Sequence, residues 1–185
     1  MEYKKLLPLV LPMVRNVPKA SAVNALRDAA IEFCAKTGVW VVDLDPVIIP
    51  AGSNIGEIYV QEEAVISRVK SVTNVFGVEI FGYSCTRNIL TLDETLPAEG
   101  TFIITAVLKP SSLTNILDDA IAEEFGSGIA NGATARLKAQ SGTEWFDATG
   151  ASAAMTLFQN DIASAKMDVI RKISGPVRIN VQSLF

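Results

Sequence analysis

The sequence predicts an α+β fold: a helical bundle, made of an N-terminal helix and C-terminal helices, that carries an inserted antiparallel β-sandwich or barrel-like region. Apolar residues recur with a helical period towards both ends of the 185-residue chain. Between them lie short segments rich in β-branched residues, separated by Gly, Pro, Asn or Asp. We therefore expect one domain with helical parts at 1–38 and 111–174, a β insertion at 39–110, and an extended C-terminal strand or tail at 175–185.

The first helix is predicted at 21–36, where small and apolar residues recur on one face. They are Ala22, Leu26, Ala29, Ala30 and Phe33. Polar residues occupy the other faces, and Gly38 follows the last turn as a C-terminal stop. Upstream, the apolar run at 6–14 is similar to part of a secretory signal. Because Pro8 and Pro12 interrupt this run, we do not expect export.

Six strands are predicted in the β insertion, each short and bounded by residues typical of turns. They lie at 39–49, 57–60, 64–70, 75–82, 88–92 and 101–108. Because helical segments flank this run on both sides, the strands are expected to form a separate layer inserted into the helical framework.

The helical pattern returns near Leu113 as two apolar stripes, which Gly126 and Gly128 separate. Because glycine weakens the interior of a helix, we expect a broken or kinked helix pair there. The last helix has apolar residues spaced alternately four and three apart: Ala151, Met155, Phe158, Ile162, Ala165 and Val169. This heptad seam requires a helical partner, either in the same chain or in a neighbouring subunit. The predicted helix-packing core consists of Leu26, Phe33, Leu137, Phe158 and Ile162.

The C-terminal tail alternates strictly between apolar and polar residues from 177 to 182, as a half-buried strand does. Five apolar residues are its predicted partner-binding residues: Val177, Ile179, Val181, Leu184 and Phe185. Unpaired backbone groups of such a strand recruit other strands, so we expect it to pair with its own sheet or with the sheet of a partner.

Charge is unevenly distributed along a chain that carries 16 basic and 20 acidic side chains. Residues 1–36 have six basic and three acidic side chains, a net charge of +3. Residues 37–112 have four basic and nine acidic ones, a net charge of −5. Proteins that grip nucleic-acid phosphates carry an excess of positive charge, so tight nucleic-acid binding is not expected. No segment reaches 18 uninterrupted apolar residues, so no membrane span is expected either.

The sequence contains no histidine and only two cysteines, Cys34 and Cys85. These counts exclude histidine-dependent nucleophile activation and cysteine or histidine zinc sites. Four carboxylate pairs remain as acid–base candidates: Asp43/Asp45, Glu62/Glu63, Asp118/Asp119 and Glu123/Glu124. Solvated surface charge is the commoner role of such pairs, and we predict no catalytic residue, no cofactor and no metal ion.

Residues 25–40 resemble the opening helix of the head-to-tail connector adaptor family of tailed phages, which includes head-completion proteins and tail tubular adaptors. The segment 129–133, followed by Leu137 and Trp145, is similar to the second helical block of this family. Phe158, Ile162 and the pair at 165–166 are similar to its third block. The strands between the blocks match the family only in position and character.

This resemblance implies a structural adaptor of the virion, assembled in the host cytoplasm, and not an enzyme. About twelve copies would form a ring beneath the portal protein, join the head to the tail nozzle or tube protein, and continue the DNA channel. Double-stranded DNA would pass through the lumen without specific binding. The C-terminal strand would reach the portal or a neighbouring subunit.

Three other functions remain open from the sequence. The chain could be a tail terminator or stopper ring protein, which commonly has sixfold symmetry. It could be a β-sandwich module that binds carbohydrate or another surface ligand, with Trp40 at the rim of the strands. An enzyme that uses Asp118 and Asp119 is the third alternative.

Overall fold

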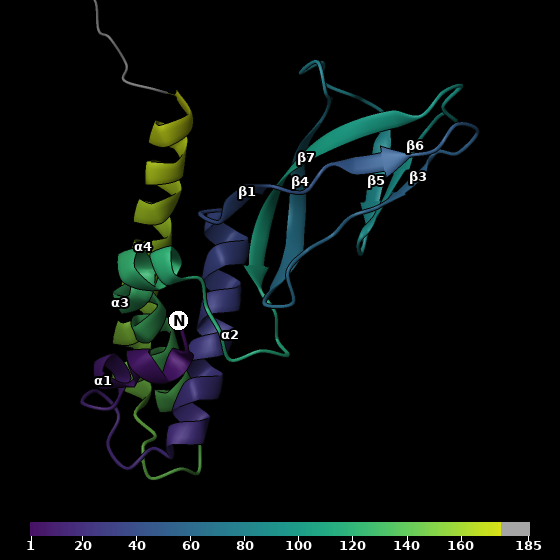
Figure 1. Cartoon of the computed structure of the whole chain (residues 1–185). Coiled ribbons are helices and arrows are strands. Elements are labelled where there is room, and N and C mark those ends of the chain that lie inside the picture. Colours follow the sequence, from purple (N-terminus) through teal and green to yellow (C-terminus); the bar gives the residue numbers. More distant parts are fainter. Residues whose placement is uncertain (175–185) are drawn as a thin grey trace, which may run out of the picture.

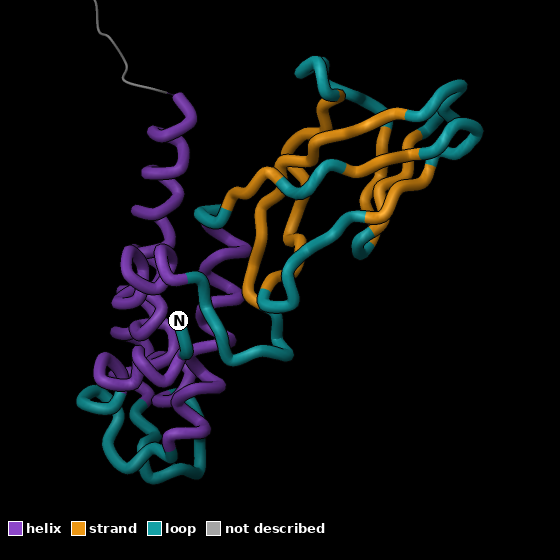
Figure 2. Tube along the Cα trace, in the orientation of Figure 1, coloured by secondary structure: helices purple, strands orange, loops and turns teal. Residues whose placement is uncertain are grey.

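The chain folds into a helical part and a β part that lie side by side and give the molecule an elongated, forked shape (Figures 1 and 2). The computed structural model describes residues 1–174. The mixed α+β fold expected from the sequence is confirmed. The predicted tail strand lies outside the described residues, with its five partner-binding residues Val177, Ile179, Val181, Leu184 and Phe185.

The helical part consists of one 3-10 helix and four α-helices. They are η1 (Tyr3–Leu6), α1 (Leu7–Val10), α2 (Lys19–Thr37), α3 (Asp119–Lys138) and α4 (Ala148–Ser174). Helix α2 ends as predicted at Gly38, which adopts a left-handed conformation with φ of 70° and donates its N–H to the carbonyl of Cys34. Within residues 1–174, no helix combines the length and the apolar character that crossing a membrane requires.

A single apolar cluster holds the helical part together, and it contains the five residues of the predicted helix-packing core. Leu26, Phe33, Leu137 and Phe158 are fully buried, and Ile162 is 7% exposed. The seam of α4 packs against α3, so its helical partner lies in the same chain. The apolar run near the N-terminus is part of this cluster, because Tyr3, Leu6, Leu7 and Val10 are all buried in it.

Helix α3 is continuous, so the expected break at Gly126 and Gly128 is wrong. Both glycines, and Gly132 one turn later, are buried on the face of α3 that meets other helices. A Cβ atom at Gly132 would lie 2.7 Å from the nearest ring carbons of Phe158 on α4. These glycines therefore permit close helix–helix approach, and the packing compensates for their low helix propensity.

Gly132→Ala is expected to lower the free energy of unfolding by about 1–3 kcal/mol, because the added methyl group would overpack the contact with the buried Phe158 ring. Gly126→Ala is the matched control on the same helix. Its Cβ would lie 3.1 Å from the terminal methyl Cδ2 of Leu6, which can move. Urea unfolding of both variants tests this account, and equal losses of stability would contradict it.

The β part contains seven strands in two antiparallel sheets. The strands are β1 (Val41–Asp43), β2 (Val47–Ile49), β3 (Ile55–Glu57), β4 (Ala64–Asn74), β5 (Tyr83–Thr86), β6 (Ile89–Leu92) and β7 (Gly100–Pro110). In the first sheet, the long strand β7 pairs with β4 along one edge and with β1 and β2 along the other. The second sheet has the order β3-β6-β5. The strands described here do not close into a barrel.

Three details of the predicted strands are wrong. The segment 39–49 forms two strands, β1 and β2, which both pair with β7. The pairing stops after Asp43↔Thr105 and resumes at Val47↔Phe102, because Pro46 between them has no N–H to donate to the sheet. The segment 57–60 is largely loop, since β3 ends at Glu57. The segment 75–82 is a loop with an isolated bridge, and strand β5 follows it.

Trp40 joins the two parts of the molecule, because it packs against both the helical and the β cluster. The β cluster lies between the two sheets and includes the buried residues Ile49, Leu90 and Ile104. Arg68 on β4 donates from Nη1 to the carbonyl of Ala35 at 3.4 Å, which ties the sheet to the last turn of α2. Packing and a hydrogen bond thus both fix the β part against α2.

Candidate functional site

Two of the carboxylates that the sequence offers as acid–base candidates, Asp118 and Asp43, have structural roles. Asp118 is the N-cap of α3, where its Oδ1 accepts a hydrogen bond from the N–H of Ile121 at 3.1 Å. Asp43 Oδ1 accepts from the hydroxyl of Thr105 at 2.6 Å. In the described part of the chain, no group of three or more cysteine, aspartate and glutamate side chains is arranged to hold a metal ion.

Three of these carboxylates line one cavity of about 320 Å³ at the junction of the helical and β parts. Asp43, Asp45 and Asp118 lie on its wall with Trp40 and Tyr59. Tyr59 is 67% exposed, and nothing in the sequence pattern singled it out. Exposed aromatic rings beside hydrogen-bond acceptors are suited to a polar ligand that has apolar faces.

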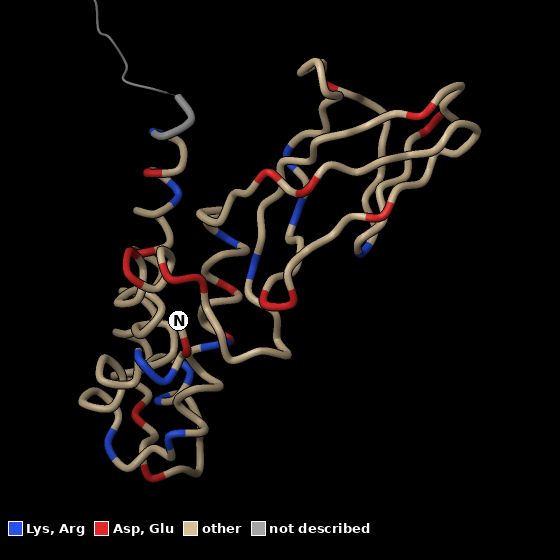
Figure 3. Tube along the Cα trace, in the orientation of Figure 1, with Lys and Arg blue, Asp and Glu red and all other residues tan. Residues whose placement is uncertain are grey.

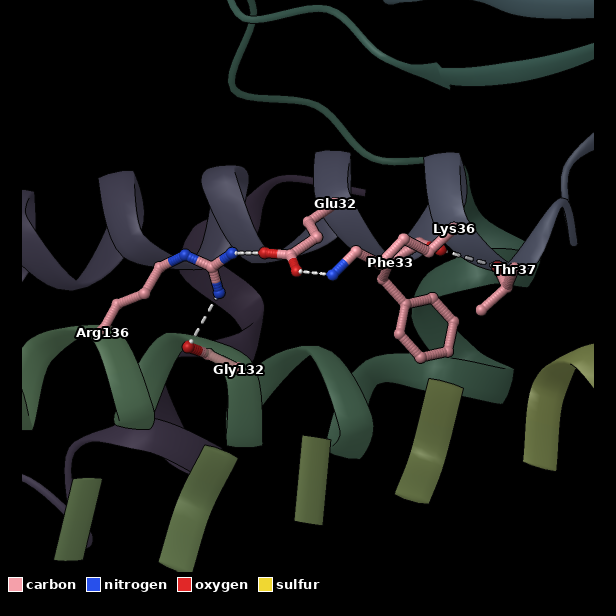
Figure 4. A network of polar contacts seen from close by, with 6 residues as sticks. All are labelled: Glu32, Phe33, Lys36, Thr37, Gly132 and Arg136. Atoms are coloured by element: carbon pink, nitrogen blue, oxygen red, sulfur yellow. Dashed lines mark hydrogen bonds and ion pairs between the residues drawn. The ribbon is translucent and has the colours of Figure 1, made fainter. Parts of the chain in front are cut away.

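A partly buried ion network ties α2 to α3 (Figure 4). Glu32 accepts from the guanidinium of Arg136 and, at 2.5 Å, from Lys36 Nζ. Arg136 also donates to the carbonyl of Gly132 at 3.0 Å and lies over the Phe158 ring, 5.5 Å from its centroid. Although burial acts to raise it, the pKa of Glu32 is lowered overall, because both cations stabilise the carboxylate.

Glu32→Gln is expected to lower the free energy of unfolding by about 1 kcal/mol at pH 7, the upper end of the range for surface ion pairs, because the pair with Arg136 is partly buried. Folding lowers the pKa of Glu32, so the ionised side chain adds to the free energy of unfolding. This contribution is complete at pH values above the ordinary pKa of 4.5, and it is lost as the pH falls through the pKa of the folded state. Urea unfolding at pH 7 and pH 3 should therefore show a difference that shrinks in acid. Glu62→Gln, at an exposed carboxyl before β4, is the control and should change neither value.

Cys34 is buried in the helical core, where burial raises the pKa of its thiol to about 12. At neutral pH it is therefore protonated and packs as a small apolar side chain. Cys85 is half-buried on β5, and burial raises the pKa of its thiol as well. Neither thiol has the lowered pKa that activates a cysteine nucleophile.

The loop that joins β4 to β5, residues 74–82, displays large apolar side chains to solvent. Phe76 is 86% exposed and Phe81 is 80% exposed, and Val75 and Val78 are more than half exposed. The turn is fixed by Asn74, whose Oδ1 accepts from the N–H groups of Phe76 and Val78, each at 3.0 Å. We call residues 74–82 the apolar loop. The β-branched and apolar composition of this segment predicts a strand, which the structure does not form there.

A second cavity, of about 570 Å³, lies beside the N-terminal half of α2. Its lining includes the apolar residues Leu7 and Val23 and the cations Lys4, Lys19 and Arg27. We call it the basic cavity. The Nε atom of Arg27 is buried and has no hydrogen-bond partner among the described residues.

Helix α4 projects past the other helices at the end opposite the basic cavity (Figure 1). Met167 and Ile170, near this end, are 51% and 54% exposed. This end of α4 therefore presents apolar side chains to solvent within the described part of the chain.

No family model matches the chain, and no curated protein matches it.

Proposed function

We propose that the chain is a structural adaptor of a tailed-phage virion, which forms a ring of about twelve copies beneath the portal and joins head to tail. The observation that carries the proposal is the display of large apolar side chains on projecting parts of the molecule. Phe76 and Phe81 lie on the apolar loop, and Met167 and Ile170 lie near the end of α4. Exposed apolar side chains grouped in this way are typical of protein–protein contact surfaces.

The resemblance of the three helical blocks to connector adaptors supports the same function. In such a ring, the affinity comes from repeated contacts between copies and from many simultaneous contacts with the portal. The proposal places the tail nozzle or tube protein on the side opposite the portal. It also has double-stranded DNA pass through the lumen without specific binding, which a net charge of −4 favours because few phosphates would be held.

Electron microscopy of the purified protein, alone and with its cognate portal protein, tests the proposal. We expect rings of about twelve subunits bound to one face of the portal. Sixfold rings that bind tail tubes would support the terminator or stopper alternative. A protein that stays off the portal and turns over a small molecule would contradict the structural function.

The cavity lined by Trp40, Tyr59 and Asp43 favours a second candidate function, carbohydrate binding by the β part. Aromatic faces pack against the apolar face of a sugar ring, and carboxylates accept hydrogen bonds from its hydroxyl groups. Glycan-array binding by the wild type that is lost in Tyr59→Ala would support it. Tyr59 is largely exposed, so this substitution should leave the fold intact. Portal binding without any glycan binding would remove this candidate.

A further inference from the structure

We propose that the apolar loop of one copy inserts into the basic cavity of the next copy, so that identical subunits join head to tail. This inference rests on the proposed function and names the contact that joins one ring subunit to the next. Both surfaces carry apolar side chains, their charges are opposite in sign, and they belong to different ends of the same molecule.

The apolar loop is ordered by its own hydrogen bonds before any partner arrives. Besides the two bonds to the Asn74 side chain, the N–H of Asn74 donates to the carbonyl of Val78 at 2.9 Å, and that of Gly77 donates to Asn74 at 2.9 Å. Gly77 has φ of +77°, which a side chain would disfavour. The turn therefore holds Phe76 outwards at little further cost in entropy, as an anchor residue of an interface requires.

The basic cavity is of a size to receive such an anchor. Its volume of about 570 Å³ lies within the ~300–1,000 Å³ of typical ligand sites. Leu7 and Val23 supply an apolar surface, while the amide groups of Asn24 and Asn115 can bond the backbone of an inserted loop. The positive charge of Arg27, which also lines the cavity, would attract a carbonyl or a carboxylate of the loop.

Charge favours contact between the apolar loop of one copy and the basic cavity of another over contact between the apolar loops of two copies. The apolar loop contains one acidic residue, Glu79, and no basic one. Asp93 lies next to its end, where the backbone N–H of Asp93 donates to the carbonyl of Gly82 at 2.9 Å. The basic cavity has three cations on its wall and no acidic lining residue. In Figure 3, acidic segments mark the far loops of the β part and basic segments gather around the start of α2.

The two surfaces of one copy cannot meet each other. The apolar loop projects from the β part on the side of the molecule towards which α4 extends, whereas the basic cavity lies beside the N-terminal half of α2, at the other end of the helical part (Figure 1). Contact between them therefore requires two molecules. Because each copy presents two different surfaces, the contact is heterologous, and repeating it generates a closed ring or an open helix of subunits.

A mixing experiment with two variants tests this contact. The loop variant carries Phe76→Ser and Phe81→Ser, and the cavity variant carries Lys4→Glu and Lys19→Glu, all at exposed positions. In sedimentation velocity, the wild type should self-associate, and each variant alone should bind itself at least tenfold more weakly. Mixed in equal amounts, they should form a 1:1 heterodimer that does not grow, because one intact loop and one intact cavity remain.

Phe146→Ser is the matched control, since Phe146 is an exposed aromatic residue outside both surfaces, and it should associate as the wild type does. Circular dichroism melting confirms that each variant is folded. Variants that associate like the wild type, a mixture that stays monomeric, or a wild type that stays monomeric throughout would overturn the contact. Portal binding, measured separately by electron microscopy, decides the adaptor function whichever result the mixture gives.

Discussion

Phe158→Ala is expected to lower the free energy of unfolding by about 3–5 kcal/mol, the usual cost of removing a fully buried phenylalanine. The Phe158 ring is 0% exposed and lies where α2, α3 and α4 meet. Its centroid is 6.2 Å from that of Phe33, and the guanidinium of Arg136 lies over its face. The ring packs directly against Gly132, which has no side chain that could fill the space the ring leaves. Alanine at position 158 would therefore leave a cavity at the centre of the helical core.

Leu157→Ala is the matched control for this prediction, because Leu157 precedes Phe158 on α4 and is 50% exposed. Its loss should cost about 0.5 kcal/mol or less, as surface substitutions usually do. Urea unfolding followed by circular dichroism measures both values. Equal losses in the two variants would mean that the seam of α4 does not face the core as described.

The period of apolar residues was sufficient to predict the helices that have one continuous buried face. Helix α2 and the seam of α4 follow from spacing, and Gly38 marks the end of α2 by its left-handed conformation. Helix α3 could not be predicted as one element. Its glycines are stabilised by contacts with Leu6 on η1 and with Asp161 and Phe158 on α4, and those neighbours are distant in sequence.

Strand boundaries depend on pairing partners, which a local pattern does not contain. The 11-residue strand β7 pairs with three other strands and thereby decides where β1 and β2 end. The β-branched and apolar residues at 75–82, bounded by turn residues, predicted a strand. The structure instead exposes Phe76 and Phe81, and the segment meets β4 only through an isolated bridge between Thr73 and Glu79. Apolar side chains on an outward surface give the same local composition as side chains that serve a core.

The candidate surfaces could be predicted only in part, for a similar reason. Trp40 was identified from the sequence as a rim residue, and it does line a cavity. Tyr59 and Asp118 line the same cavity but lie far from Trp40 in the sequence, so only the fold brings the three residues together. The basic cavity also combines residues of η1, α1, α2 and the linker before α3, and no local motif marks it.

Removal of residues 175–185 is expected to abolish incorporation into the ring or onto the portal while leaving the subunit folded. Both apolar clusters are formed among residues before 175, so we expect the free energy of unfolding to change by about 0.5 kcal/mol or less. The alternating segment at 177–182 is suited to adding a strand to the sheet of a partner, where backbone hydrogen bonds supply affinity.

A pair of triple variants separates strand addition from a mere requirement for length. Serine at Val177, Ile179 and Val181 removes the apolar face, whereas alanine at Arg178, Asn180 and Gln182 changes only the opposite face of the predicted strand. We expect the first variant to lose at least about 100-fold in portal affinity, which corresponds to about 2.7 kcal/mol, and the second to stay within about threefold of the wild type. Surface plasmon resonance on immobilised portal measures both. Because side-chain pockets distinguish the two faces of an added strand, equal losses would show that the tail acts as a tether of a given length and binds no sheet.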